Sequence, residues 1–228
     1  MRNALLLLVF AVLTLGAVPV LFVCVLFGLR DAFLGYGRWM MRVGRFILGI
    51  KVDIAGLDRL DHHTPYVFMS NHTSFLDAPL FVTAMDRHLR FIVKRFVLRI
   101  PVLGLGMGFA GYVPLDKEDA GQGRERIARA AKMIRERAYS FLIYPEGTRS
   151  WDGRLLPFRR GGFFLAVGSG VPIVPVSIRG THELMPRKTW RIRKGSVRIV
   201  IHEPIPVAGI GPDAIPELME RVRAAIAS

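Results

Sequence analysis

A histidine and an aspartate five positions apart are the residues of this chain best suited to chemistry. They lie in the segment Asn71-His72-Thr73-Ser74-Phe75-Leu76-Asp77, directly after the apolar run 66–69. An α-helix turns about 100° per residue, so the side chains of His72 and Asp77 can meet only across a turn. Ser74, followed three residues later by Asp77, predicts such a turn and a helix that begins at Ser74. The carboxylate would then fix the imidazole tautomer and leave the other ring nitrogen to accept a proton from a hydroxyl.

No nucleophile stands beside this pair, so the substrate is expected to supply the hydroxyl. A histidine and an aspartate at this spacing also occur by chance, without any catalytic role. A second segment, 140–150, favours catalysis: an apolar strand runs into Pro145, Gly147 and Arg149. Glycine permits close approach of a backbone, and arginine offers a planar, permanently charged fork that suits phosphate. Arg159, a few residues downstream, adds a further cation beside two glycines.

Four segments of the chain resemble, in order, the sequence blocks of the glycerolipid acyltransferase family, which includes bacterial 1-acylglycerol-3-phosphate acyltransferases. Residues 71–77 resemble the first block and residues 111–117 the second, in which Lys117 replaces the usual arginine. Residues 144–150 resemble the third block, with Tyr144 where phenylalanine is usual, and residues 171–176 resemble the fourth. Lysine keeps the positive charge at position 117 but loses the bidentate fork of arginine.

The resemblance implies that His72, oriented by Asp77, deprotonates the hydroxyl of a lysophospholipid, which then attacks an acyl thioester. The implied donor carrier is acyl-carrier protein or coenzyme A. Because the thioester carries its own activation, neither a metal nor another cofactor is expected. Glu146 is expected to support the turn or a substrate hydroxyl rather than act as a second base. The implied substrate-binding residues are Lys94, Gly111, Lys117, Glu146, Gly147, Thr148, Arg149 and Arg159.

Two alternatives stay open from the sequence. An enzyme of the same family could use another acceptor, such as a lyso-ornithine lipid or glycerol 3-phosphate. A membrane-tethered binding protein without turnover would leave the His72–Asp77 turn unexplained. The 228 residues carry a net charge of +14, which suits an anionic membrane surface or nucleic acid. No nucleic-acid-binding motif is present, so we expect no nucleic-acid partner.

The N-terminal residues predict a membrane-associated helical segment. From Ala4 to Leu29 the chain has no charged residue. This apolar segment is long enough to cross a bilayer. A signal peptide would have a shorter apolar region, so a retained anchor is favoured. Pro19 leaves open a re-entrant hairpin instead of a span. Arginines recur on one face of the next segment, which is typical of an interfacial helix; they are Arg38, Arg42 and Arg45.

This organisation predicts two parts: a membrane anchor with an interfacial helix at 1–50, and an α/β acyltransferase domain at 51–228. Excess positive charge after the apolar run places the catalytic part on the cytoplasmic side of the cell inner membrane. In the second part, short apolar runs alternate with helical patterns, which predicts a mixed, partly parallel sheet flanked by helices. The expected strands are 66–69, 89–93, 111–115, 141–144, 173–178 and 197–201; apolar stripes at 127–138 and 215–226 predict helices.

Overall fold

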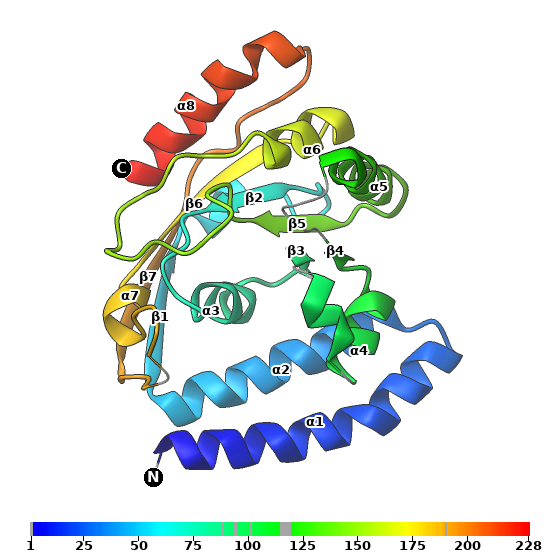
Figure 1. Cartoon of the computed structure of the whole chain (residues 1–228), viewed down its shortest axis with the longest axis vertical. Coiled ribbons are helices and arrows are strands. Elements are labelled where there is room, and N and C mark those ends of the chain that lie inside the picture. The colour runs from blue at the N-terminus through cyan, green and yellow to red at the C-terminus, as the bar shows by residue number, and fades with distance from the viewer. Residues whose placement is uncertain (1, 88, 94, 101, 115–119, 190) are drawn as a thin grey trace.

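The computed structural model describes residues 2–87, 89–93, 95–100, 102–114, 120–189 and 191–228 (Figure 1). In this part of the chain one mixed sheet has the strand order β1-β7-β6-β2-β5-β3-β4. The strands are β1 (Ile50–Ala55), β2 (Val67–Ser70), β3 (Leu89–Val93), β4 (Val113–Pro114), β5 (Ser140–Ile143), β6 (Ile173–Arg179) and β7 (Gly195–Ile201).

Parallel pairing gathers the strand ends that precede the predicted site. Strand β2 pairs in parallel with both β5 and β6, and β3 pairs in parallel with β5 and β4. The chain therefore leaves these five strands at the same edge of the sheet, where open α/β sheets bind their ligands. Antiparallel pairing of β7 with β6 and parallel pairing of β1 with β7 complete the sheet. The predicted mixed α/β fold is confirmed.

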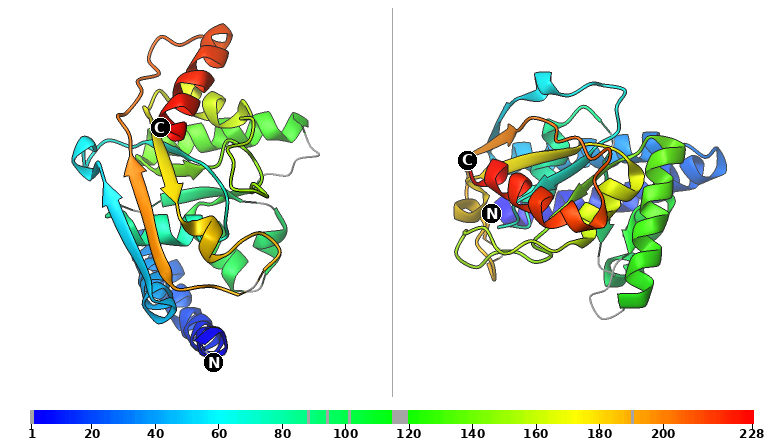
Figure 2. Two further views of the ribbon diagram at one scale, coloured as in Figure 1. Left: turned by 90° about the vertical axis from the view of Figure 1, so that its left-hand side faces the viewer. Right: turned by 90° about the horizontal axis from the view of Figure 1, so that it is seen from above.

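Helices cover both faces of the sheet, as Figures 1 and 2 show. On one face lie α1 (Arg2–Leu26), α2 (Arg30–Leu48), α3 (Asp77–Ala84) and α4 (Leu103–Ala110). On the other face lie α5 (Ala120–Arg137), α6 (Gly161–Ser169) and α8 (Ile215–Ala227). The short helices η1 (Leu57–Arg59), η2 (Arg95–Arg99), α7 (Thr181–Leu184) and η3 (Pro212–Ala214) lie in the connections.

The two apolar faces of the sheet make two separate cores. Phe68 and Leu142 pack with side chains of α3, such as Phe81, whereas Val67 and Phe141 pack with residues of α5, α6 and α8. Neighbouring strand residues point to opposite faces, so one strand serves both cores. Because both faces are covered, β2 and β5 are buried throughout and apolar except for one serine each; their apolar runs predict them from the sequence.

Strand β1 is absent from the strands expected from the sequence. Its apolar residues Ile50, Val52 and Ile54 alternate with Lys51 and Asp53, the period-two pattern of a half-buried strand. The chain enters β1 directly from α2, with Gly49 in the left-handed conformation as the helix end. The predicted boundary at residue 50 therefore coincides with a helix-to-strand turn, and no linker separates the two parts.

Helices α1 and α2 form an antiparallel hairpin along one side of the molecule (Figure 1). The Tyr36 hydroxyl on α2 donates to the Leu13 carbonyl oxygen on α1 at 2.8 Å. No helix in the described ranges combines the length and the hydropathy needed to cross a membrane. The spanning segment predicted from the sequence is therefore not confirmed.

Two of the three arginines of α2 that the sequence assigned to an interfacial face contact α3, and the third, Arg42, is exposed. Arg38 donates to the carbonyl oxygen of Met85, which ends α3, at 3.3 Å. Arg45 donates to the Thr83 hydroxyl at 3.4 Å. A cation at a helix C-terminus interacts favourably with the helix dipole. These arginines therefore fasten α2 to the helix that carries Asp77.

Candidate active site

His72 and Asp77 meet at the carboxyl end of β2, as the sequence predicts. His72 Nδ1 lies 2.8 Å from Oδ2 of Asp77, and Asp77 is fully buried. The same oxygen accepts backbone N–H bonds from Thr73 and Ser74, each at 2.8 Å. A carboxylate accepts from Nδ1–H, so the neutral imidazole carries its free lone pair on Nε2. This is the tautomer that a general base at Nε2 requires.

The turn itself differs from the prediction. Helix α3 begins at Asp77 with Leu76 at the N-cap position, so the predicted helix start at Ser74 is wrong. The Ser74 hydroxyl accepts the N–H of Leu76 at 3.2 Å and donates to the Met185 carbonyl oxygen at 2.9 Å. Because these bonds close a turn outside the helix, Asp77 comes first in α3 and can reach back to His72.

Thr181, which the sequence analysis did not identify, belongs to this network. Its hydroxyl donates to Oδ1 of Asp77 at 2.5 Å and lies 3.0 Å from the Thr73 hydroxyl. Each hydroxyl has one proton, so Thr73 must be the donor to Thr181. Thr181 follows the end of β6, so no local spacing links it to Asp77. The one signal in the sequence was that Thr181 follows an apolar strand, which could have been expected to end at the same sheet edge as the strand before His72.

Glu146 binds the backbone of two loops. Its Oε1 accepts the N–H of His72 at 2.7 Å, and Oε2 accepts the N–H of Leu156 at 2.8 Å. Burial raises the pKa of Glu146 to about 7, although both backbone hydrogen bonds oppose that shift. The carboxyl group therefore holds the loop of His72 in place, as a structural partner of the turn.

The imidazole of His72 is stacked on Tyr144, at the end of β5. The two rings lie 3.9 Å apart between centroids and 16° from parallel. Burial raises the pKa of the Tyr144 hydroxyl well above its ordinary value. The hydroxyl therefore stays protonated, and the ring restricts rotation of His72 out of the plane set by Asp77.

The third sequence block forms the turn after Tyr144. Gly147 has φ +66°, and a Cβ there would lie 2.9 Å from the Arg159 side chain, so the glycine is needed for both conformation and space. Thr148 is partly buried in the same turn. Arg149 places its guanidinium 3.4 Å from the centre of the Phe75 ring, over the loop that joins His72 to Asp77.

Other predicted site residues are farther from His72 or outside the described residues. Gly111 ends α4 in the left-handed conformation, where a Cβ would lie 2.9 Å from Met133 and 3.5 Å from Tyr139. Helix geometry and packing explain this glycine, and its predicted role in substrate binding stays a prediction. Lys94 and Lys117 lie outside the described residues.

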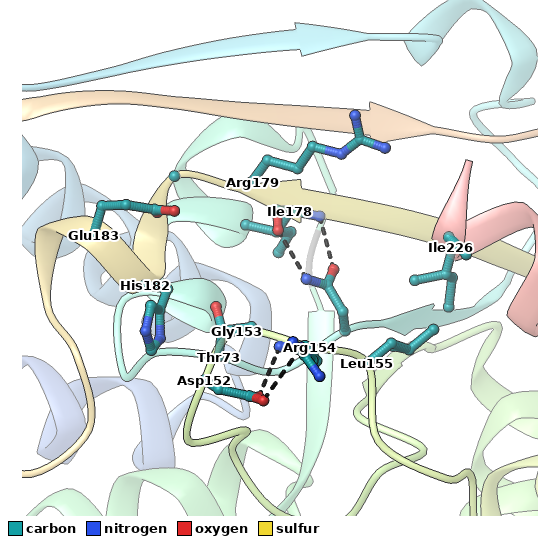
Figure 3. A pocket seen from close by; sticks show the side chains of 13 residues that line it. Thr73, Asp152, Gly153, Arg154, Leu155, Ile178, Arg179, His182, Glu183 and Ile226 are labelled. Atoms are coloured by element: carbon teal, nitrogen blue, oxygen red, sulfur yellow. Dashed lines mark hydrogen bonds and ion pairs between the residues drawn. The ribbon is translucent and has the colours of Figure 1, made fainter.

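Two cavities lie in the described part of the protein, and only the second lies beside the loop of His72. An apolar cavity of about 420 Å³ lies among α1, α2, α3 and α4, with Leu34, Met41 and Tyr112 in its wall. A polar cavity of about 430 Å³ lies beside Thr73, with Asp152 and His182 in its wall (Figure 3). Among the described residues, no cluster of three or more histidine, cysteine, aspartate or glutamate side chains could hold a metal.

Comparison with known proteins agrees with this geometry. Residues 51–179, more than half of the chain, match the family described as Acyltransferase. The chain belongs to the acyltransferase family. This acyltransferase carries His72, Asp77, Glu146 and Arg149 within the matched segment, and Thr181 two residues beyond it.

Its similar relatives are named 1-acyl-sn-glycerol-3-phosphate acyltransferases. BAT2 of Brassica napus chloroplasts is 41% identical over 157 residues, which cover 68% of this chain and 45% of the relative. The human alpha enzyme is 32% identical over 186 residues, covering 82% and 66% of the two chains. This acyltransferase thus spans about half to two thirds of the length of these relatives.

A solved structure is similar over nearly the whole chain. It is the crystal structure of the 1-acyl-sn-glycerophosphate (LPA) acyltransferase PlsC from Thermotoga maritima. The TM-score is 0.81 at 26% sequence identity, and the match covers 99% of this acyltransferase and 94% of PlsC. The similarity includes the N-terminal helices, which lie outside the segment matched by the family.

Proposed function

We propose that the chain is a 1-acyl-sn-glycerol-3-phosphate acyltransferase. It would transfer an acyl group from a thioester, on acyl-carrier protein or coenzyme A, to the free hydroxyl of 1-acyl-glycerol-3-phosphate, giving phosphatidic acid. The observation that carries this proposal is the 2.8 Å contact of His72 Nδ1 with a buried carboxylate that accepts three further hydrogen bonds. The names of the relatives support the choice of acceptor.

The mechanism needs only the lone pair on His72 Nε2. This nitrogen accepts the proton of the acceptor hydroxyl as the oxygen attacks the thioester carbonyl carbon. A C–O bond forms, the C–S bond breaks, and the proton on His72 passes to the leaving thiolate. Asp77 stabilises the imidazolium between these steps and does not itself move a proton. Arg149 would bind the acceptor phosphate and so hold the hydroxyl near His72.

We also propose that α1 attaches the protein to the cytoplasmic face of the cell inner membrane. Apolar side chains along α1 are exposed to solvent, including Leu15 at 73% and Phe22 at 69%. Contiguous exposed apolar surface marks contact with a partner or a membrane, and both proposed substrates carry acyl chains. Attachment would deliver the acceptor from the bilayer to the site.

One assay tests the activity directly. Purified protein is incubated with lysophosphatidic acid and a labelled acyl thioester, and the products are separated by chromatography. We expect labelled phosphatidic acid from the native protein and at most a trace from His72→Ala. Transfer to a lyso-ornithine lipid or glycerol 3-phosphate, but not to lysophosphatidic acid, would correct the acceptor. No transfer to any of the three by folded protein would overturn the proposal.

A further inference from the structure

The segment that follows α7 lies against the loop that carries His72. The Ser74 hydroxyl donates to the Met185 carbonyl oxygen at 2.9 Å. Two residues farther on, Arg187 Nη1 donates to the carbonyl oxygen of Arg149 at 2.8 Å. These bonds join the segment to both active-site loops. The cations of this segment are therefore held beside the proposed phosphate-binding arginine.

Two half-exposed aromatic rings position these cations. Arg149 lies over Phe75, while Arg187 lies 3.8 Å and Lys188 4.8 Å from the centre of the Trp151 ring. Phe75 is 54% exposed and Trp151 is 55% exposed. A cation over an aromatic face is attracted to it and loses freedom of movement. The charged groups are thus ordered without being removed from solvent.

The charge of Asp77 acts on Arg149, but the cations of this cluster lack an ion-pair partner within the described part of the chain. No carboxylate there forms an ion pair with Arg149, Arg187 or Lys188. Burial, followed by the nearby charge of Arg187, lowers the pKa of Arg149. Lys188 also has φ +69°, an uncommon conformation for lysine that a surrounding structure must hold in place. Like charges held together in this way are stabilised when an anion binds between them.

We propose that Arg187 and Lys188 complete, with Arg149, a binding site for a doubly charged phosphate monoester, the headgroup of the acceptor. This inference rests on the proposed function for the acceptor and adds two positioning residues that lie outside the four sequence blocks. A phosphate monoester carries a charge of about −1.5 to −2 at neutral pH and offers three acceptor oxygens. A phosphate diester carries one charge, and a zwitterionic lyso-lipid carries none. The site would therefore distinguish acceptors by the charge of their headgroups.

Binding to an inactive protein tests the site without turnover. In a His72→Ala background, isothermal titration calorimetry measures the affinity for a short-chain lysophosphatidic acid and for its phosphate methyl ester, which is a monoanion. The variants are Lys188→Gln and the pair Arg187→Gln with Lys188→Gln. Arg191→Gln is the matched control, since it removes one exposed positive charge from the same segment. Soluble short-chain ligands keep membrane attachment out of the comparison.

We expect the double variant to lose about 10- to 100-fold in affinity for the monoester, the usual effect of hydrogen bonds to charged groups. Affinity for the methyl ester should change much less, and Arg191→Gln should match the parent. Within the described residues the Lys188 side chain lies over the Trp151 ring and forms no hydrogen bond. The smaller affinity loss expected of Lys188→Gln should therefore occur without a change in melting temperature.

Three results would overturn the proposal: unchanged monoester affinity, an equal loss for both ligands, or an equal loss in Arg191→Gln. Weaker binding of coenzyme A alone would assign the cations to the donor and would also overturn it. Selective monoester binding by a protein that shows no acyl transfer would retain the anion site and reject the proposed function.

Discussion

Thr181 donates a hydrogen bond to Oδ1 of Asp77 at 2.5 Å, although 104 residues separate the two in the chain. Strands β2 and β6 are parallel neighbours, so the residues that follow them meet at one edge of the sheet. The bond means that the orientation of the Asp77 carboxylate depends on both loops. His72 is consequently positioned by residues from two distant parts of the sequence.

Replacing Thr181 with Val should lower kcat by about tenfold, because the lost donor leaves a buried carboxylate oxygen unsatisfied at a cost of about 1–3 kcal/mol. Thr181→Ser keeps the hydroxyl and should retain most of the activity. Steady-state kinetics on a soluble acceptor, together with thermal melts, provide the measurement. Equal activity of the Val and Ser variants would show that the bond does not position Asp77.

His72→Ala should reduce turnover by about 10²- to 10⁴-fold, the contribution of a positioned acid–base group. Asp77→Asn should also lose activity severely, because an amide cannot stabilise the imidazolium and would face several N–H and O–H donors. Vesicle binding should not change in His72→Ala. Near-native turnover by His72→Ala would exclude the general-base mechanism.

The raised pKa of Glu146 predicts a pH-dependent stability. Folding raises this pKa from 4.5 to about 7, so the stability that Glu146 contributes is present below pH 4.5 and is lost as the pH rises to about 7. Relative to Glu146→Gln, the native protein should lose up to about 3 kcal/mol of unfolding free energy across that window. Urea unfolding of both proteins at several pH values measures the difference. A difference independent of pH would contradict the raised pKa.

Two glycines of α4 provide a matched pair for the packing of α4 on α2. A Cβ on Gly106 would lie 2.4 Å from the Phe33 ring, whereas a Cβ on Gly108 would meet no atom within 4 Å. Gly106→Ala should therefore destabilise the fold by about 1–3 kcal/mol through overpacking. Gly108→Ala should be neutral or stabilise it by up to about 1 kcal/mol, because alanine favours the helix. Denaturant unfolding compares the two, and equal effects would refute this contact.

Exposed apolar residues on α1 should determine membrane attachment. Leu15→Ser with Phe22→Ser should weaken binding to anionic vesicles by about tenfold or more, since each side chain would lose apolar contact worth about 1–3 kcal/mol. Phe164→Ser on α6 removes a 43% exposed side chain from the opposite face of the sheet and serves as the control. Co-sedimentation measures binding. Unchanged binding of the α1 variant would reject α1 as the attachment site.

The sequence predicts the part of the site that local spacing determines. The turn between His72 and Asp77, the strands β2 and β5, and the glycine at position 147 follow from short patterns. Thr181 and Arg187 could not be found in this way, because only strand order and pairing bring them to Asp77 and Arg149. The start of α3 was placed too early because the Ser74 hydroxyl bonds to Met185, a residue that no local pattern connects to it.

The arginines of α2 illustrate a different limit. Their spacing correctly predicts one basic face of a helix, but a helical period does not reveal which surface that face meets. In the structure Arg38 and Arg45 reach α3. A charged stripe beside an apolar segment can therefore serve tertiary packing as readily as a lipid surface.

Arg90 ties the N-terminal hairpin to the sheet. It is 2% exposed, donates to Asp31 on α2 at 2.7 Å and to the carbonyl oxygen of Ala110 at the end of α4, and lies over the Tyr139 ring. Because Arg90 makes these contacts and no linker separates α2 from β1, the hairpin is held in a fixed orientation relative to the sheet. If α1 rests on a bilayer, His72 stands at a set height above the lipid plane. An acceptor must rise to that height, so the depth of its hydroxyl in the membrane becomes a criterion of selection.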